Sequence, residues 1–231
     1  MESKSTTEFA RQIDVEFSDQ SILQQAFIHR SYVNEHRGEA VEHNERLEFL
    51  GDAVLELVVT DFLFHSFPKK PEGELTAYRA ALVNTNTLAT AAGKLGMNEY
   101  LMLSRGESKD TGRARQYILA NTFEAVIGAL YLDQGYESAK KFIETNIFPL
   151  TDEVVSKRLW QDSKSRFQEE AQERVSVTPA YELLSEAGPD HDKTFKVGVF
   201  LGEEQIAIGA GKSKQEAEQE AAKNAVELKG W

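Results

Sequence analysis

The sequence predicts two domains of different class, an all-α domain followed by a smaller α+β domain with the element order α-β-β-β-α. Residues 1–150 show helical spacing of apolar residues and no strand-like alternation. Residues 179–210 alternate as three strands do, with a helical stretch on each side. The length of 231 residues and the 41% hydrophobic content are those of a globular protein with a sizeable core. We therefore expect domains at 1–155 and 164–231, joined by a linker at 156–163.

The first domain is expected to consist of helices separated by short polar turns. Ser18 to Ser21 provides turn and capping residues between the first two helices. The stretches 34–44 and 103–115 are polar, contain glycine and are expected to be loops. The expected helices are 7–13, 21–27, a long helix that begins near residue 44 and ends near Phe67, 74–82, 85–95, 117–132 and 136–146.

The second domain begins where the pattern changes beyond the linker. A helix is expected at 165–174, followed by strands at 179–186, 194–201 and 204–210. An alanine-rich helix is expected at 213–228.

The long helix carries acids among apolar residues. Its apolar stripe, expected to face the core, consists of Leu47, Leu50, Val54 and Leu57. Glu48 and Asp52 are four residues apart, so both carboxylates lie on one face and repel each other unless a cation lies between them. Solvated surface acids are the simpler interpretation of such a pair. The apolar neighbours and Gly51, which leaves room for close approach, favour a functional pair.

The helix at 117–132 supplies the second half of a candidate metal site. It is nearly all apolar, and its only acid is Glu124, with Asn121 one turn earlier. A buried acid is costly unless it is paired or binds a metal. Oxygens of Glu48, Asp52, Asn121 and Glu124 together form the type of shell that Mg²⁺ prefers.

Several stretches resemble the bacterial ribonuclease III family. They are residues 44–55 (NERLEFLGDAVL), 25–32 (QAFIHRSY), 72–75 (EGEL), 79–84 (RAALVN) and the helix from Ile118 to Leu132. The α-β-β-β-α half, with GPDH at 188–191 and GAGKSKQEAE at 209–218, resembles a double-stranded RNA-binding domain. The resemblance covers nearly the whole chain and implies an endonuclease domain followed by an RNA-binding domain.

The resemblance implies an Mg²⁺-dependent endoribonuclease, with Mn²⁺ as a possible substitute, that leaves short 3′ overhangs on double-stranded RNA in RNA processing and decay. It assigns Asp52, Glu124 and Glu48 to catalysis, and these three with Asn121 to the metal. Glu45 and Glu72 correspond to further cleft acids, although exposed glutamates are commonly only solvated.

The family also forms homodimers, and the resemblance implies that Phe49 inserts into a pocket of the second subunit. A phenylalanine of the subunit's own core is the competing interpretation.

The resemblance also implies how the second domain meets RNA, since such domains recognise A-form shape. Ser165, Gln168 and Glu169 correspond to contacts in one minor groove and His191 to a contact in the other, whereas Lys212 and Lys214 correspond to phosphate contacts. The family usually has a second basic residue at the position of Gln215, which predicts weaker binding. Taken singly, these residues are ordinary surface side chains.

Asn121 departs from the family pattern, which has an aspartate there. An amide oxygen binds Mg²⁺ but carries no negative charge and accepts no proton. The alternative hypothesis is therefore a weakened or inactive dimeric protein that binds double-stranded RNA without cutting it. A third interpretation, a structural metal site in a helical bundle, leaves the second domain unexplained.

The net charge of −12 is unfavourable for a protein that binds a polyanion. Residues 164–231 hold 9 Lys and Arg against 13 Asp and Glu, so the second domain is also negative. RNA binding is therefore expected to depend on local basic clusters and on salt. With no cysteine, no apolar leader and no apolar stretch of membrane-spanning length, a cytoplasmic protein without membrane contact is expected.

Overall fold

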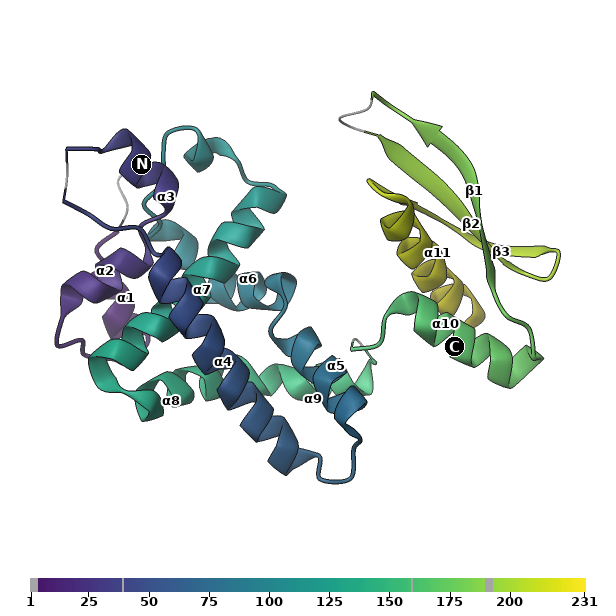
Figure 1. The fold of residues 1–231 in the computed structure, drawn as a ribbon, viewed down its shortest axis with the longest axis horizontal. Helices are drawn as coiled ribbons and strands as arrows, with labels where there is room; N and C mark the ends of the chain where they lie inside the picture. Colours follow the sequence, from purple (N-terminus) through teal and green to yellow (C-terminus); the bar gives the residue numbers. More distant parts are fainter. Residues whose placement is uncertain (1–3, 39, 159, 190–192) are drawn as a thin grey trace. The chain divides into compact units, whose positions relative to one another are not determined.

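The computed structural model describes residues 4–38, 40–158, 160–189 and 193–231, and the chain divides into two compact units (Figure 1). Unit 1 spans Met1–Trp160 and unit 2 spans Gln161–Trp231. The division falls inside the stretch 156–163 that we expected to be a linker, and the extent of that linker stays a prediction.

Unit 1 is helical, and its described residues form no strand apart from an isolated bridge between Ile28 and Met102. Its α-helices are α1 Thr6–Gln12, α2 Gln20–Ala26, α3 Arg30–Glu35, α4 Glu45–Ser66, α5 Glu72–Leu82, α6 Thr85–Lys94, α7 Arg113–Gln134, α8 Tyr136–Asn146 and α9 Thr151–Ser156. Three short 3₁₀ helices are η1 Met97–Glu99, η2 Glu107–Lys109 and η3 Phe148–Leu150. In the part of the chain that the structure describes, no helix is both long and apolar enough to cross a membrane.

Local sequence explains where several helices begin. The side chains of Asp19 and Asn84 accept hydrogen bonds from backbone N–H groups in the first turns of α2 and α6. Two helices were not predicted, α3 and α9. His29 caps α3 in place of the usual short polar residue, and the six-residue α9 is held by packing of Val154 into the core. Helix α7 also begins earlier than predicted, at Arg113.

Helices α4 and α7 form the centre of unit 1 and cross at two glycines (Figure 1). A Cβ atom on Gly51 would lie 1.7 Å from the backbone oxygen of Glu124, and one on Gly128 would lie 2.2 Å from the backbone oxygen of Leu47. Any side chain at either position would hold the helices apart. The two glycines therefore allow the acids of both helices to approach one another.

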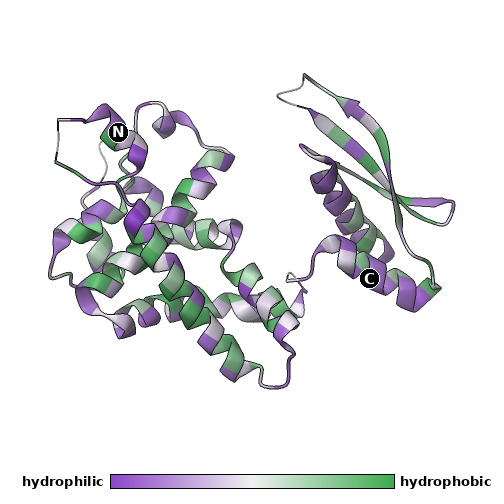
Figure 2. Cartoon of the chain, viewed as in Figure 1, coloured by the Kyte–Doolittle hydropathy of each residue, from purple (hydrophilic) through white to green (hydrophobic). Residues whose placement is uncertain are grey.

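The core stripe of α4 differs from the predicted one. Leu47 and Val54 are buried as predicted, but Leu50 is only partly buried and Leu57 is 57% exposed. The buried residues of α4 are Leu47, Gly51, Val54, Leu55, Val58, Val59 and Leu63. Because α4 carries apolar residues on more than one face, as Figure 2 shows along much of its length, spacing alone did not identify the face that packs inward.

Unit 2 confirms the predicted α-β-β-β-α order. Helix α10 Ser163–Val175 is followed by strands β1 Ala180–Ala187, β2 Thr194–Leu201 and β3 Glu204–Gly211 and by helix α11 Lys214–Lys229. The strands form one antiparallel sheet in the order β1-β2-β3; α11 lies against β2 and β3, and α10 packs against α11 (Figure 1). Phe167, Val199 and Ala221 are fully buried between these layers. Gly209 allows close packing, because a Cβ there would lie 2.1 Å from the backbone nitrogen of Ala221.

Candidate functional site: an acidic cluster between α4 and α7

The crossing of α4 and α7 brings together the four residues predicted to form the metal site. Glu48 and Asp52 lie on α4, one turn apart, and Asn121 and Glu124 lie on the facing helix. The side-chain amide of Asn121 acts on the carboxylate of Glu48 and lowers its pKa. Asp52 is exposed, whereas Glu48 and Glu124 are partly buried. Acids of both helices therefore share one partly buried region.

The carboxylates of this cluster raise one another's pKa values by electrostatic repulsion. Burial, and then the charges of Asp52, Glu48 and Glu56, raise the pKa of Glu124 to about 8. Burial, and then the charge of Glu45, also raise the pKa of Glu48, and the hydrogen bond from Asn121 opposes this effect. The carboxylates of the cluster thus repel one another, and nearby groups do not fully compensate their negative charge.

The donor set suits a hard cation. Three carboxylates and one amide oxygen are ligands that Mg²⁺ accepts, and a cation would relieve the repulsion among the acids. Within the described ranges, however, no three His, Cys, Asp or Glu side chains are grouped closely enough to form a ready-made metal site. The residues fit Mg²⁺ by chemistry and by helix placement, and their side chains would have to converge around it.

Glu56 is an acid of this cluster that the sequence analysis did not single out. It continues the spacing of Glu48 and Asp52 by one more turn of α4, and its charge contributes to the raised pKa of Glu124. Its carboxylate lies 2.8 Å from Nε of Arg79 on α5, and Arg79 also donates to Thr60 at 3.1 Å. The repeat of acids every four residues, at Glu48, Asp52 and Glu56, was the sequence pattern that could have identified Glu56.

The two further predicted cleft acids occupy different positions. Glu45 begins α4, where its carboxylate lies 3.6 Å from Arg30 and 3.7 Å from His43. It belongs to the edge of the cluster, since its charge raises the pKa of Glu48. Glu72 is an exposed residue at the start of α5 that accepts a hydrogen bond from Thr76 at 2.8 Å. It is not among the charges that act most strongly on Glu124.

Phe49 does not lie in the core of the subunit, so the competing interpretation is wrong. Its side chain is 81% exposed on α4. Leu57 and Phe64 follow at eight and fifteen residues and are 57% and 65% exposed. These spacings place all three on one side of the helix. Unit 1 thus presents an apolar stripe to solvent, of a kind that marks interaction surfaces.

In unit 2, the predicted RNA contacts of α10 lie on one exposed side of that helix. Ser165, Gln168 and Glu169 are exposed and spaced by three and four residues. The Ser165 hydroxyl is hydrogen-bonded to the capping residue Asp162, and Glu169 accepts from Gln161 at 2.5 Å.

The first turn of α10 also contacts the first half of α11. Asp162 accepts a hydrogen bond from Gln219 at 3.1 Å, and the ammonium group of Lys164 lies 2.6 Å from Glu218. Two of the predicted contact elements are therefore held to each other.

The predicted phosphate contacts lie at the start of α11. Lys214 is its first residue, and Lys212 lies just before it, with its backbone N–H bonded to Glu216 at 2.9 Å. Both lysines are exposed, as is Gln215. His191, the predicted contact in the second minor groove, lies outside the described residues.

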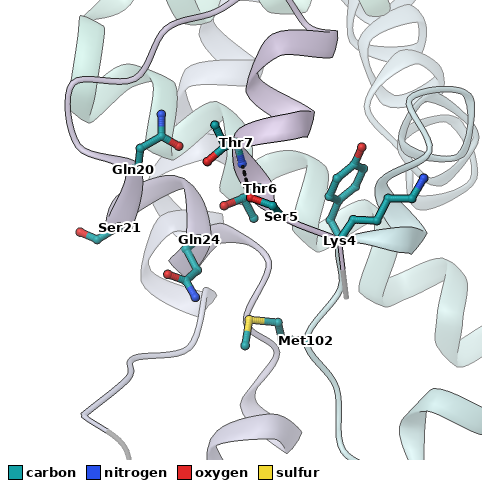
Figure 3. A pocket seen from close by; sticks show the side chains of 9 residues that line it. Lys4, Ser5, Thr6, Thr7, Gln20, Ser21, Gln24 and Met102 are labelled. Carbon is teal, nitrogen blue, oxygen red and sulfur yellow. Dashed lines mark hydrogen bonds between the residues drawn. The ribbon is translucent and has the colours of Figure 1, made fainter. Parts of the chain in front are cut away.

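A separate polar pocket of about 390 Å³ lies in unit 1 (Figure 3). It is lined by Lys4, Ser5, Thr6, Thr7, Gln20, Ser21, Gln24, Tyr100 and Met102. Ser5 accepts a hydrogen bond from the backbone of Thr7 at 3.3 Å, and Lys4 is paired with Glu99. None of the predicted site residues lines this pocket, so it is distinct from the acidic cluster.

Comparison with known proteins yields matches along both units. Residues 19–151 match the family model described as "Ribonuclease-III-like", and residues 163–229 match the one described as "Double-stranded RNA binding motif". The chain is 46% identical over 226 residues to Ribonuclease 3 of Enterococcus faecalis, covering 98% of both. It is 47% identical over 220 residues to Ribonuclease 3 of Geobacillus kaustophilus, covering 95% of this chain and 89% of the relative.

A solved structure resembles unit 1. The nuclease domain of ribonuclease III from Campylobacter jejuni aligns with a TM-score of 0.55 and 40% identity, covering 62% of this chain and 97% of that domain. That structure is described as flexible in a region involved in dimer formation.

Proposed function

The chain belongs to the ribonuclease III family, and from this premise we propose that it cleaves double-stranded RNA in an Mg²⁺-dependent reaction. The observation that supports the proposal is the glycine-mediated crossing of α4 and α7, which places the helix that carries Glu48 and Asp52 against the helix that carries Asn121 and Glu124. The double-stranded RNA-binding unit supports the choice of substrate. RNA processing and decay is the biological setting that this activity suits.

The residues of the cluster have distinct roles in the proposed reaction. Glu48, Asp52, Asn121 and Glu124 would hold Mg²⁺, and Mn²⁺ would bind to the same oxygens. When bound, the ion supplies Lewis-acid chemistry that activates water and neutralises charge on the leaving oxygen. The amide of Asn121 favours the ionised form of Glu48, since it lowers the pKa of that carboxyl group.

The pair between Arg79 and Glu56 keeps a further acid from competing for the ion. Glu45 and Glu72 are proposed as outer acids that help to position the metal or the RNA strand.

We also propose that two copies associate through the exposed apolar stripe of α4. Phe49, Leu57 and Phe64 would be buried between the subunits, and burial of such side chains favours association. The dimer-forming region of the Campylobacter jejuni nuclease domain supports this assembly. Two sites in one dimer would cut the two strands of a duplex and leave short 3′ overhangs.

A second function is carried by Asn121. Its amide cannot balance the charge of a cation as an aspartate does, and its donor group acts on the Glu48 carboxylate, which a metal would otherwise use. Both features weaken metal binding. The corresponding proposal is a dimer that binds double-stranded RNA through unit 2 and does not cut it.

The deciding experiment is cleavage of a labelled RNA duplex at low salt in Mg²⁺, Mn²⁺ or EDTA. The unaltered chain is compared with Glu124→Ala, Asn121→Asp and the control Glu137→Ala, which removes an exposed acid in the first turn of α8. Cleavage with a divalent ion that only Glu124→Ala abolishes would support the nuclease. Cleavage by Asn121→Asp alone would instead support the binding protein, and a cooperative thermal transition of unit 1 checks that every variant is folded.

A further inference from the structure

The row of acids on α4 is flanked by an arginine at each end. Glu45, at the start of the helix, lies 3.6 Å from Nη1 of Arg30, and Glu56 lies 2.8 Å from Nε of Arg79 on α5. The acids between these ends are those proposed to hold the cation. Because RNA is a polyanion that the acids repel, the border of the row is where positive charge can hold a strand.

Arg79 is fixed in place by two side chains of α4. Its Nε contacts Glu56, and its Nη1 donates to the hydroxyl of Thr60 at 3.1 Å, one helical turn further on. At 1.5 Å per residue, Glu56 lies about 6 Å beyond Asp52 along the helix axis. The charge of Glu56 is also among those that act on Glu124. The guanidinium group of Arg79 is therefore held next to the acidic cluster.

These two contacts engage only part of the guanidinium group. Such a group carries five N–H donors. In the part of the chain that the structure describes, the contacts of Arg79 involve Nε and Nη1 and do not involve Nη2. The side chain is 35% exposed. Because the planar donors match the oxygens of a phosphate and are already oriented, little conformational freedom is lost when such a ligand binds.

The pair between Arg79 and Glu56 contributes little to the fold of unit 1. The two side chains are 35% and 37% exposed, and water and salt screen ion pairs at such positions. Helix α5 is anchored instead by its buried residues Tyr78, Ala81 and Leu82. Arg79 is therefore not required to hold α5 in the domain, and a function in binding accounts better for its place beside the acids.

Arg79 also shares one face of α5 with a predicted cleft residue. Glu72, Thr76 and Arg79 are spaced by four and three residues, so they lie on one side of the helix. Glu72 and Thr76 are exposed, and the Thr76 hydroxyl donates to Glu72 at 2.8 Å. Glu72 is proposed above to help position the metal or the RNA strand. A strand that follows this face from Glu72 would reach Arg79 about 10 Å further on.

We propose that Arg79 binds a backbone phosphate of the RNA strand next to the acidic cluster. Glu56 and Thr60 hold the guanidinium group in place, and the N–H groups of Nη2 bind the phosphate oxygens. Hydrogen bonds between an arginine and a phosphate are charge-assisted and therefore strong. Arg79 is a binding residue without a part in the chemical step. This inference rests on the proposed function, since it assigns a contact with the same substrate.

The test separates a phosphate contact from simple neutralisation of Glu56. Arg79→Gln is compared with the double variant Glu56→Gln/Arg79→Gln, which removes both charges, and with Arg11→Gln, which removes one charge from α1. Binding of the full chain to an RNA duplex is measured in EDTA over a range of salt concentrations. Loss of one phosphate contact reduces the slope of log K against log salt by about 0.7–0.9. We expect this reduction in Arg79→Gln and in the double variant, but not in Arg11→Gln.

Cleavage kinetics in Mg²⁺ provide a second measurement. The double variant is used because it leaves no acid free at position 56 to compete for the ion. We expect a several-fold higher KM for the duplex and a kcat changed by less than about twofold, since the contact is made equally before and during the chemical step.

Each other outcome has a defined meaning. A salt slope of the double variant equal to that of the unaltered chain would show that Arg79 only neutralises Glu56, and would overturn the inference. An equal reduction in Arg11→Gln, or a fall in kcat with KM unchanged, would overturn it as well. Because binding is measured without a divalent ion, the contact is tested even if no variant cleaves RNA, an outcome that would refute only the nuclease. Thermal melting checks that the variants are folded, and the double variant leaves no unpaired charge at this position.

Discussion

Replacement of Gly51 by alanine tests whether the crossing of α4 and α7 organises unit 1. The new Cβ would lie 1.7 Å from the backbone oxygen of Glu124, 2.6 Å from its carbonyl carbon and 2.9 Å from the backbone nitrogen of Gly128. All three are backbone atoms, which cannot rotate aside as a side chain can. To reach 3.4 Å, where ordinary contact begins, the helices would have to separate by about 1.7 Å.

The free-energy change follows from two opposing effects. Overpacking a core costs typically 1–3 kcal/mol, and immovable backbone atoms place this site at about 3 kcal/mol or above. Alanine is favoured over glycine within a helix by about 1 kcal/mol. The expected net loss is at least about 2 kcal/mol. For a domain of this size, such a loss lowers Tm by roughly 4–8 °C.

Tryptophan fluorescence can follow unit 1 separately, since each unit contains one of the two tryptophans. Trp160 packs against Tyr78 in unit 1 at 5.1 Å between ring centres, and Trp231 packs against Phe167 in unit 2 at 5.5 Å. In a Trp231→Phe background, thermal or urea unfolding followed by fluorescence therefore reports unit 1. Gly93→Ala in α6 is the matched control, because a Cβ there meets nothing within 4 Å.

The control variant should keep its Tm or gain slightly from helix propensity. A Tm of Gly51→Ala equal to that of Gly93→Ala would refute the close crossing. Retained RNA cleavage with a lowered Tm would instead show that the acids do not depend on this helix spacing.

Three further predictions concern the cluster and the exposed stripe. The pKa of Glu124 is about 8 in the folded state and 4.5 in the unfolded state, so the folded state holds this proton more tightly. The contribution of the protonated Glu124 to the free energy of unfolding is therefore complete below pH 4.5 and is lost as the pH rises to 8. In EDTA, the Tm of the unaltered unit 1 should therefore fall between pH 5 and 8.5 relative to the Tm of Glu124→Gln. The corresponding loss of unfolding free energy is at most about 4 kcal/mol. Parallel curves of Tm against pH for the two proteins would contradict the burial of this acid. Asn121→Asp should lower Tm in EDTA and increase the rise in Tm on adding Mg²⁺, because it exchanges a donor to Glu48 for another negative charge; a smaller rise than in the unaltered chain would argue against a ligand at this position. Phe49→Asp should yield a monomer in analytical ultracentrifugation whereas Leu228→Asp, at a 72% exposed leucine of α11, should leave the assembly unchanged; a dimer in both would exclude the stripe as the interface.

Local sequence determined the class of both units and indicated which residues form the candidate site. Helical spacing of apolar residues predicted α4, α7 and α8, and period-two alternation predicted the three strands, because these periods arise from the backbone geometry of each element. The four-residue spacing of Glu48 and Asp52 placed their carboxylates on one helix face without any tertiary information. The repeat extends to Glu56, which was equally readable from the sequence.

Tertiary structure decided which faces pack and which acids meet. Helix α4 is apolar on more than one side, so only its contact with α7 determined that Leu55 is buried and that Phe49 and Leu57 are exposed. The pKa of Glu124 depends on charges brought from another helix, and no spacing within α7 encodes them. Helix α9 likewise forms through core contacts, since a six-residue helix is marginal by itself. Local periodicity thus specified the elements, whereas burial and long-range charge, which depend on distant parts of the chain, specified the site.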